Sequence, residues 1–282
     1  MLNGEEKDSR KMKREVDKMK TGKVSLVGKA LCLLCCAVML AGCGKKKNTA
    51  QGGISAPEKT GAAVISDRLD TDNYDITLRV LGETADPVEC RMVRNGDNGL
   101  VTMRRSGVYS IFYTISGEST MLLPEINCYR SIDGQNSFGN AFIKLGKDDM
   151  LYDITENKDE VTEVYKPSDP AAKETYYFTF DKATGELKKA VTESEGSETV
   201  TTNVEHMEWN SGPIELPDLT GWDDISDDAS VSDVTAIKVS FYTRGITPDM
   251  VEKEGYTYEQ LARMDPDETD EISRQILEKE GK

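Results

Sequence analysis

Few side chains in this chain have the type and spacing that catalysis requires. His206 is the single histidine, so a Ser-His-Asp arrangement has one candidate base, and no Gly-x-Ser-x-Gly turn is present to carry the serine. The phosphate-binding patterns Gly-x-x-x-x-Gly-Lys and Gly-x-Gly-x-x-Gly are also missing. His206 stands between Glu205 and Met207 in a polar segment, where we expect it to face solvent. The sequence therefore predicts a protein that is not an enzyme.

A group of carboxylates, Asp223, Asp224, Asp227 and Asp228, could in principle bind calcium weakly. It lacks the EF-hand order of ligands, with a central glycine and a closing glutamate. Acidic linkers of this kind are usually solvated. One histidine and two separated cysteines in the body of the chain cannot supply zinc ligands at motif spacing. We expect no metal and no cofactor.

Cys43 has the clearest chemical context of any side chain. It follows Leu40, Ala41 and Gly42, which close a short apolar segment that starts at Ala30. A basic region precedes this segment and contains Lys11, Lys13, Arg14, Lys18, Lys20, Lys23 and Lys29. A positive start, an apolar middle and small residues at the cut are the three parts of an export signal. The apolar segment is shorter than the roughly 20 residues of a membrane-spanning helix, so residues 1–42 are predicted to be a signal peptide.

The stretch Leu40-Ala41-Gly42-Cys43 resembles the lipobox of bacterial lipoproteins. In that family the cysteine thiol receives a diacylglyceryl group, and cleavage makes the cysteine the first residue. The resemblance implies a lipid anchor on Cys43, with palmitate among its acyl chains, at the extracytoplasmic face of the cell membrane. Residues 43–62 are rich in Lys, Gly, Ser, Thr and Pro and predict a flexible tether, with an average reach of about 25 Å as a random coil.

The charge of the chain excludes one class of partner. The signal peptide holds nine basic and five acidic residues, and removing them from totals of 35 and 51 leaves 26 and 46, a net charge of −20. Nucleic acid binding depends on neutralised phosphates, so we expect no nucleic acid partner. A large net negative charge of this kind most often serves to keep a protein soluble.

Strand signals dominate from residue 73 to residue 209. Apolar residues alternate with polar ones from Tyr74 to Val80 and from Tyr109 to Ile115, which is the period of a half-buried strand. Turn sequences such as Asn95–Gly99 and Asp181–Gly185 separate neighbouring strands. Hairpins with no helical crossover predict an antiparallel sheet, in a domain of residues 63–222. Residues 132–172 are less regular and predict a short helix or loop that packs on the sheet.

The C-terminal part, residues 223–282, is predicted to contain the acidic connector, one strand at Ala236–Thr243 and three short helices. The helix starts are marked by Thr247-Pro248, by Thr257 with Gln260, and by Asp265-Pro266, which are capping patterns. The predicted fold class is thus mainly β with some α. It comprises a curved antiparallel sheet or half-barrel with short covering helices and a small helical C-terminal tail.

One apolar face of this sheet is the candidate binding surface. Its predicted members are Tyr74, Ile76, Leu78, Tyr109, Ile111, Tyr113, Tyr176, Phe178 and Phe180. A sheet must bury such a face, either under its own helices as an ordinary core or around a ligand. Cys90 and Cys128 could form a disulfide, although a cysteine in a strand is as often a small buried hydrophobe.

The order of these elements is similar to the half-barrel lipoproteins and lipoprotein carriers of the LolA, LppX and LprG type. The likeness is carried by the Tyr-x-Ile-x-Leu-x-Val strand from Tyr74, by Ile111–Tyr113 with Gly117 and Leu122–Tyr129, and by the meander Tyr176–Leu187. It implies a curved sheet that carries a lipid or a lipidated protein in its cavity. The expected function is therefore a cell-envelope lipoprotein that binds a lipid or another apolar ligand. The alternative is a membrane-anchored module with a closed β core that binds an envelope protein through its acidic C-terminal helices.

Overall fold

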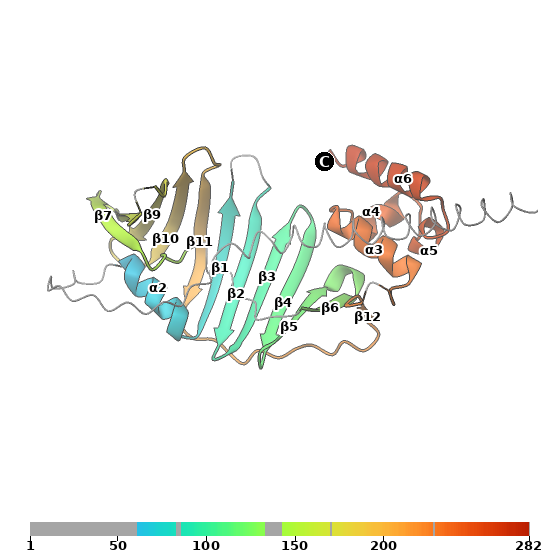
Figure 1. The fold of residues 1–282 in the computed structure, drawn as a ribbon, viewed down its shortest axis with the longest axis horizontal. Helices are drawn as coiled ribbons and strands as arrows, with labels where there is room; N and C mark the ends of the chain where they lie inside the picture. Colours follow the sequence, from blue (N-terminus) through green and yellow to red (C-terminus); the bar gives the residue numbers. More distant parts are fainter. Residues whose placement is uncertain (1–60, 83–85, 133–142, 170, 228, 282) are drawn as a thin grey trace, which may run out of the picture. The chain divides into compact units, whose positions relative to one another are not determined.

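The computed structural model describes residues 61–82, 86–132, 143–169, 171–227 and 229–281. They fall into two compact units, one ending at Trp222 and the other beginning at Asp223. The larger unit contains helix α2 and a curved, unclosed antiparallel sheet, and the smaller unit contains helices α3 to α6 (Figure 1). The prediction of a mainly β fold with an antiparallel sheet, short helices and a helical C-terminal part is confirmed.

The sheet of the larger unit is built from two meanders that meet at its centre. Strand β1 pairs with β2 on one side and with β11 on the other, so the order is β6-β5-β4-β3-β2-β1-β11-β10-β9-β8-β7. The strands are β1 (Tyr74–Leu81), β2 (Val88–Asn95), β3 (Asn98–Arg105), β4 (Val108–Ile115), β5 (Glu118–Leu123), β6 (Cys128–Ile132), β7 (Asp149–Glu156), β8 (Glu160–Pro167), β9 (Glu174–Asp181), β10 (Leu187–Ser194) and β11 (Val200–Glu208). A short 3-10 helix, η1 (Pro124–Ile126), separates β5 from β6.

The predicted hairpin turns are confirmed. Gly96 has φ of 59° between β2 and β3, and Gly185 has φ of 72° between β9 and β10. Glycine adopts this left-handed conformation without steric cost. The N–H of Gly96 also donates to the side chain of Asn73 at 2.7 Å, which ties the first hairpin to the start of β1.

Strands β7 and β8 correct the expectation of a helix or loop within residues 132–172. The residues of β8 on its inward face are Val161, Glu163 and Tyr165. The carboxylate of Glu163 interrupts the alternation of apolar and polar residues that would have marked a strand. Strand β7 is exposed along most of its length, because it lies at the edge of the sheet. Its residues therefore do not alternate between buried and exposed positions in the way that would mark a strand. The apolar residues of this segment were expected to pack on the sheet. Ile143 is buried, whereas Met150 and Tyr152 are exposed, which contradicts the expectation, and Phe142 lies outside the described residues.

Helix α2 (Gly61–Thr71) occupies the last two residues of the predicted tether and the first residues of the predicted β domain, for which no helix was predicted. Its buried side chains include Ala62, Ile65 and Leu69, spaced as on one face of an α-helix. The folded part of the chain therefore contains a helix directly before β1, and the tether, as predicted to residue 62, overlaps the start of that helix. The rest of the predicted tether lies outside the described residues.

The smaller unit begins with the two-residue strand β12 (Asp223–Asp224), and its helices are α3 (Asp233–Thr243), α4 (Pro248–Lys253), α5 (Tyr258–Leu261) and α6 (Pro266–Lys279). The strand predicted at Ala236–Thr243 was wrong, because this segment is α3. The Ser232 side chain caps the helix by accepting the N–H of Thr235, and Gly245 ends it at φ of 84°. These end signals, with burial of Thr235, Val239 and Tyr242 on one face, override the β preference of the individual residues.

The last three helices start where the sequence predicted. Thr257 and Gln260 form the expected capping box, and Asp265 accepts the N–H of Asp267 at the start of α6. The unit has a core of its own, made of Phe241, Ile246, Val251, Leu261 and Ile276. The smaller unit is therefore a folded body with its own core, whereas the sequence predicted a small helical tail.

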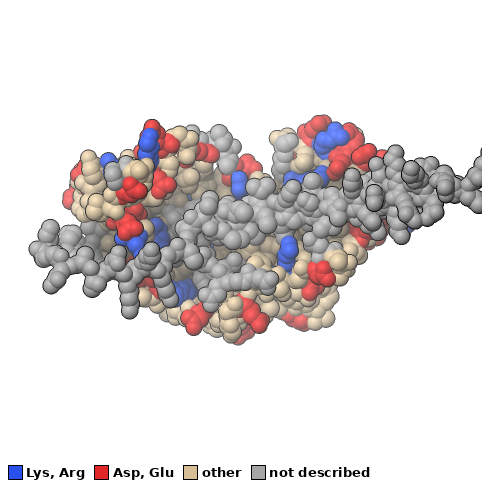
Figure 2. All heavy atoms as spheres, in the orientation of Figure 1, with Lys and Arg blue, Asp and Glu red and all other residues tan. Residues whose placement is uncertain are grey.

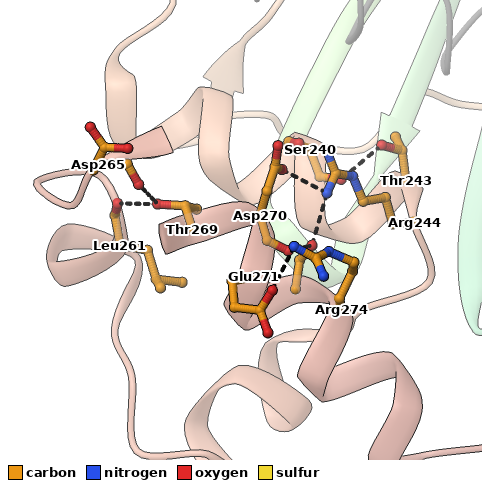
Figure 3. A network of polar contacts seen from close by, with 10 residues as sticks. Ser240, Thr243, Arg244, Leu261, Asp265, Thr269, Asp270, Glu271 and Arg274 are labelled. Carbon is orange, nitrogen blue, oxygen red and sulfur yellow. Dashed lines mark hydrogen bonds and ion pairs between the residues drawn. The ribbon is translucent and has the colours of Figure 1, made fainter. Parts of the chain in front are cut away.

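A polar network joins the end of α3 to α6 (Figure 3). Nη1 of Arg244 donates to Asp270 Oδ1 at 2.9 Å and to Ser273 Oγ at 2.8 Å. Ser273 is buried, so these bonds are partly shielded from water. Thr269, one turn before Ser273 in α6, donates to the backbone carbonyls of Leu261 and Asp265.

Candidate apolar binding face

Strand pairing assigns each side chain to one of two faces of the sheet, since directly paired residues share a face. We call one of them the α2 face, defined by Tyr74, Ile76 and Leu78 of β1 together with the residues paired to them. The pairing carries this face through Met92 of β2 and Val101 of β3. It continues to Phe112 and Met121 in one direction and to Ala190, Phe178 and Glu163 in the other.

Six of the nine predicted ligand-facing side chains lie together on the α2 face. They are Tyr74, Ile76, Leu78, Tyr176, Phe178 and Phe180. The other three, Tyr109, Ile111 and Tyr113, are on the opposite face, because their neighbours Val108, Ser110 and Phe112 are the β4 residues that point to the α2 face. The prediction that β4 alternates between two faces was correct, but the wrong set of its residues was assigned to the ligand-facing side. Both of its faces carry apolar side chains, so the sequence could not distinguish them.

Helix α2 is fixed to this face by a buried carboxylate. Glu163 of β8 accepts the N–H of Gly61 at 2.9 Å and that of Ala62 at 3.0 Å, and it also accepts the hydroxyl of Tyr165 at 3.2 Å. Glu163 is 6 % exposed. The first N–H groups of a helix lack intrahelical partners and carry positive partial charge. A carboxylate at this position accepts their hydrogen bonds and supplies the opposite charge.

Further polar contacts hold the rest of α2, among them an ion pair between Asp70 and Lys144. Ser66 accepts the N–H of Leu145 at 2.9 Å, and the carbonyl of Leu69 accepts Nη1 of Arg94 at 3.0 Å. At the start of the helix, a Cβ added to Gly61 would lie 3.1 Å from the Phe180 ring, so the helix approaches the sheet closely there. The helix thus spans from β8 and β9 to the end of β2.

The hydroxyl of Tyr74 is a polar atom buried on the α2 face without a hydrogen-bond partner in the part of the chain that the structure describes. The Tyr74 side chain is fully buried. Burial raises the pKa of this hydroxyl to about 12, with Arg94 opposing the rise and Asp70 of α2 adding to it. A buried hydroxyl without a partner costs about 1–3 kcal/mol, so its presence in the middle of an apolar face needs a reason.

The apolar surface is wider than α2. From Phe178 on β9 to Met121 on β5 there are seven strand-to-strand steps, which correspond to about 34 Å at the usual strand spacing. The 11 residues of α2 form a helix about 16 Å long. Met92, Val101, Phe112 and Met121 are nevertheless buried, with exposed fractions of 0 to 9 %. Access to this face therefore requires a covering segment to move.

The two cysteines of the sheet are buried, and neither is in a disulfide. Cys90 is on β2 and Cys128 on β6, four strand-to-strand steps apart, or about 19 Å, whereas a disulfide needs Cα atoms within about 7 Å. The disulfide alternative is therefore not realised. Burial raises the pKa of the Cys90 thiol to about 12, and Cys128 donates to the carbonyl of Ile126 at 3.4 Å.

The other chemistry-bearing residues lie apart from this face. His206 is exposed on β11, 3.7 Å from Glu208. Asp223 accepts the hydroxyl of Thr235 at 2.9 Å, while Asp224 accepts Ser226. Asp228 lies outside the described residues, and within the described ones no group of three or more His, Cys, Asp or Glu side chains is placed to hold a metal ion. Acidic side chains are scattered over the visible surface with basic ones among them (Figure 2).

The predicted lipobox, Leu40 to Cys43, lies outside the described residues. Among the helices that are described, none combines the length and the apolar character needed to cross a membrane. Membrane attachment thus stays a prediction from the sequence motif.

Comparison with known proteins adds little to this description. No family model matches the sequence, and no curated protein does. Among solved structures, the fold is similar to "Crystal structure of MucB", with 11 % identity and a TM-score of 0.35 over 55 % of this chain and 59 % of that one. It is also similar to "Crystal structure of MucB in complex with MucA(peri)", with 13 % identity and a TM-score of 0.28 over 55 % of this chain and 56 % of that one. The matched part spans less than two thirds of either structure.

Proposed function

We propose that this chain is a cell-envelope lipoprotein, anchored through Cys43, that binds the acyl part of a lipid or a similar amphiphile between α2 and the sheet. The observation that carries the proposal is the Tyr74 hydroxyl, buried on the α2 face with no partner among the described residues. Buried polar groups are almost always hydrogen-bonded. An ester or carboxyl oxygen of an amphiphile would supply the missing acceptor, while its chain would lie along apolar side chains.

The extent of the face supports the same function. Its apolar side chains continue for about 34 Å across the sheet, about twice the length of α2, from Phe178 to Met121. Ligand sites are commonly apolar surfaces with a few placed polar groups. Tyr74, with Arg94 of β2 and Asp70 of α2 near enough to shift its pKa, would be the polar end of this site.

The proposal also requires a way in, because the face is buried. The described polar contacts that hold α2 are few, and Glu163 makes two of them, with Gly61 and Ala62. Release of the helix would break these hydrogen bonds, at about 1 kcal/mol each, and would expose Ile65 and Leu69, which are buried, at about 1.5–3 kcal/mol each. A ligand that covers the same apolar surface would offset the second cost. Helix α2 would therefore act as a lid.

The test compares Tyr74→Phe with Tyr113→Phe in the full-length, detergent-extracted protein. Tyr113 is on the opposite face, so its variant is the matched control. Binding of parinaric acid, a fluorescent fatty acid, is titrated, and co-purified lipid is identified by mass spectrometry. We expect Tyr74→Phe to weaken probe binding three- to tenfold and to leave the unliganded protein as stable or slightly more stable, since it removes an unsatisfied polar group.

The diagnostic result for Tyr74→Phe is weaker probe binding together with equal or higher stability of the unliganded protein. Lower stability of Tyr74→Phe with unchanged probe affinity would mean that the hydroxyl has a structural partner, and the site assignment would be wrong. Absence of both probe binding and co-purified lipid in the parent protein would rule out the lipid function itself. In that case the protein-interaction alternative would stand.

A further inference from the structure

Strand β7 forms one edge of the sheet. It pairs with β8 on one side, and among the described residues no strand lies on its other side, as Figure 1 shows at the end of the sheet. An edge strand presents a row of backbone N–H and C=O groups that can pair with another extended chain.

This edge also carries exposed apolar side chains. The described residues include five large hydrophobic side chains that are clearly exposed, and three of them are on β7: Met150 at 59 %, Tyr152 at 68 % and Ile154 at 46 %. Charged residues and bulges are the usual means by which proteins protect a sheet edge from pairing. Strand β7 has both, with a register shift between Leu151 and Asp153 and several carboxylates. Its three large apolar side chains have no such protective role, and they are the groups that an added strand would cover.

The two faces of β7 differ at this edge. Met150 is paired with Lys166, whose Nζ lies 3.7 Å from the centre of the Tyr152 ring, so Met150 and Tyr152 lie beside a cation. Ile154 is paired with Glu163 and so lies on the α2 face. The register shifts between Leu151 and Asp153, which places Tyr152 at a bulge. An added strand would meet one apolar group on each side of its backbone.

Charge selects the kind of strand that fits. Residues 147–160 contain six acidic and two basic side chains. Within the described residues Asp153 has no ion pair, whereas Glu156 is paired with Lys182 at 2.6 Å. Like charges opposite one another destabilise paired strands, so two copies of β7 would repel, and an extended segment that alternates basic and apolar residues would be attracted.

We propose that β7 is a docking edge for an extended segment of another protein that adds a strand to the sheet and that alternates lysine or arginine with apolar residues. Main-chain hydrogen bonds to β7 would supply affinity, and contacts with Met150, Tyr152 and Ile154 would supply specificity. Asp153 would attract the basic side chains. Ile154 borders the proposed lipid site through its pairing with Glu163, but the docking proposal does not require a bound lipid.

The test uses a synthetic eight-residue peptide of alternating lysine and valine, with a glutamate–valine peptide as the opposite-charge probe. Binding to the full-length protein is measured by fluorescence anisotropy at low and high salt. Hydrogen exchange followed by mass spectrometry then measures protection of residues 150–156. We expect the lysine peptide alone to bind, more weakly as salt rises, and to slow amide exchange along β7.

Three variants locate the contact. Asp153→Lys should weaken the lysine peptide at least fivefold, and Tyr152→Ser should weaken it severalfold. Leu216→Ser is the matched control, because Leu216 is a 40 % exposed apolar residue outside β7, in the segment between β11 and β12, and it should leave binding unchanged. Thermal unfolding of each variant checks that it is folded.

Several results would overturn the proposal. The lysine peptide could fail to bind at millimolar concentration, or both peptides could bind equally well. The lysine peptide could also bind without slowing the amide exchange of residues 150–156. A concentration-dependent dimer in sedimentation experiments, lost in Tyr152→Ser, would identify a second copy of the chain as the occupant instead.

Discussion

The carboxylate of Glu163 on β8 accepts the backbone N–H of Ala62, the second residue of α2, at 3.0 Å. The two residues are 101 positions apart in sequence, so this bond fixes the helix before β1 to the second meander of the sheet. Glu163 acts on α2 as a capping residue would, but from another element. It converts a free helix start into a point of attachment.

We expect Glu163→Ala to lower the free energy of unfolding by about 2 kcal/mol, because it leaves two buried donors without a partner. Glu163→Gln should cost about half as much, since the amide oxygen still accepts one N–H but the charge that favours a helix start is lost. Urea denaturation of both variants measures the difference. Equal stability of Glu163→Ala and the parent would mean that the helix start is satisfied by water.

The same substitution also tests the lid. If α2 covers the lipid site, Glu163→Ala should raise the association rate of parinaric acid severalfold and increase hydrogen exchange in residues 61–71. Ser66→Ala, which removes the acceptor of the Leu145 N–H, should give the same effect to a smaller degree. Faster exchange without faster probe entry would show that α2 moves but does not gate the site.

A second prediction concerns alkaline pH. Burial raises the pKa of Tyr74 and of Cys90 to about 12, from reference values of 10.0 and 9.0. For both groups the folded state holds the proton more tightly, so the stability they contribute is complete below about pH 9 and is lost as pH rises toward 12. Each group contributes a slope of up to about 1.4 kcal/mol per pH unit within its own window.

Urea midpoints measured from pH 8 to the alkaline limit of the native state check this. We expect the loss of stability to be shallower in Tyr74→Phe and in Cys90→Ala than in the parent. Tyr152→Phe, at an exposed position, should follow the parent. Parallel curves for all four proteins would show that neither buried group is responsible.

Parts of this fold were predictable because the sequence pattern was local. Gly96 and Gly185 marked hairpins, and Thr257 with Gln260 marked a helix start. The errors arose where a tertiary contact contradicted the local pattern. Glu163 broke the alternation of β8 because its partner is the start of α2, which no sequence rule links to residue 163.

The candidate site was half predictable for a related reason. Alternation identifies which residues of a strand share a face, but the face of β4 that joins the α2 face is set by pairing with β3 and β5. Tyr109, Ile111 and Tyr113 were therefore assigned to the wrong side. The unpartnered hydroxyl of Tyr74 could not be read from the sequence at all, since hydrogen bonding depends on what surrounds the side chain.

A third prediction concerns the smaller unit. We expect Arg244→Ala to lower its stability by about 2 kcal/mol, because the guanidinium bonds Asp270 and the buried Ser273, and bonds to charged groups contribute about 1.5–3 kcal/mol. Arg274→Ala is the matched control. Its ion pair with Glu271 lies on the surface of α6, where such pairs contribute below about 1 kcal/mol.

Thermal unfolding followed by far-UV circular dichroism of the full chain measures both variants. The double substitution of Arg244 and Asp270 should be less destabilising than the sum of the single ones, since each single change already breaks the shared bond. If Arg274→Ala costs as much as Arg244→Ala, the buried position of Ser273 is not what gives the network its strength.

The last prediction concerns the anchor. Cys43→Ser should release the protein from the membrane fraction and abolish incorporation of labelled palmitate, because serine cannot form the thioether that attaches the diacylglyceryl group. Two acyl chains hold a protein on a bilayer stably, whereas one gives only reversible binding. The net charge of −20 calculated for residues 43–282 would repel anionic lipid headgroups except near Lys45 to Lys47.

Cys36→Ser is the control, because it changes a cysteine of the apolar segment seven positions earlier without altering the residue that follows Ala41-Gly42. It should leave both fractionation and labelling as in the parent. Membrane retention of Cys43→Ser with undiminished palmitate would show that the chain is held by something other than this residue. Retention without palmitate would instead assign the attachment to a protein partner, and β7 would be the first surface to test for it.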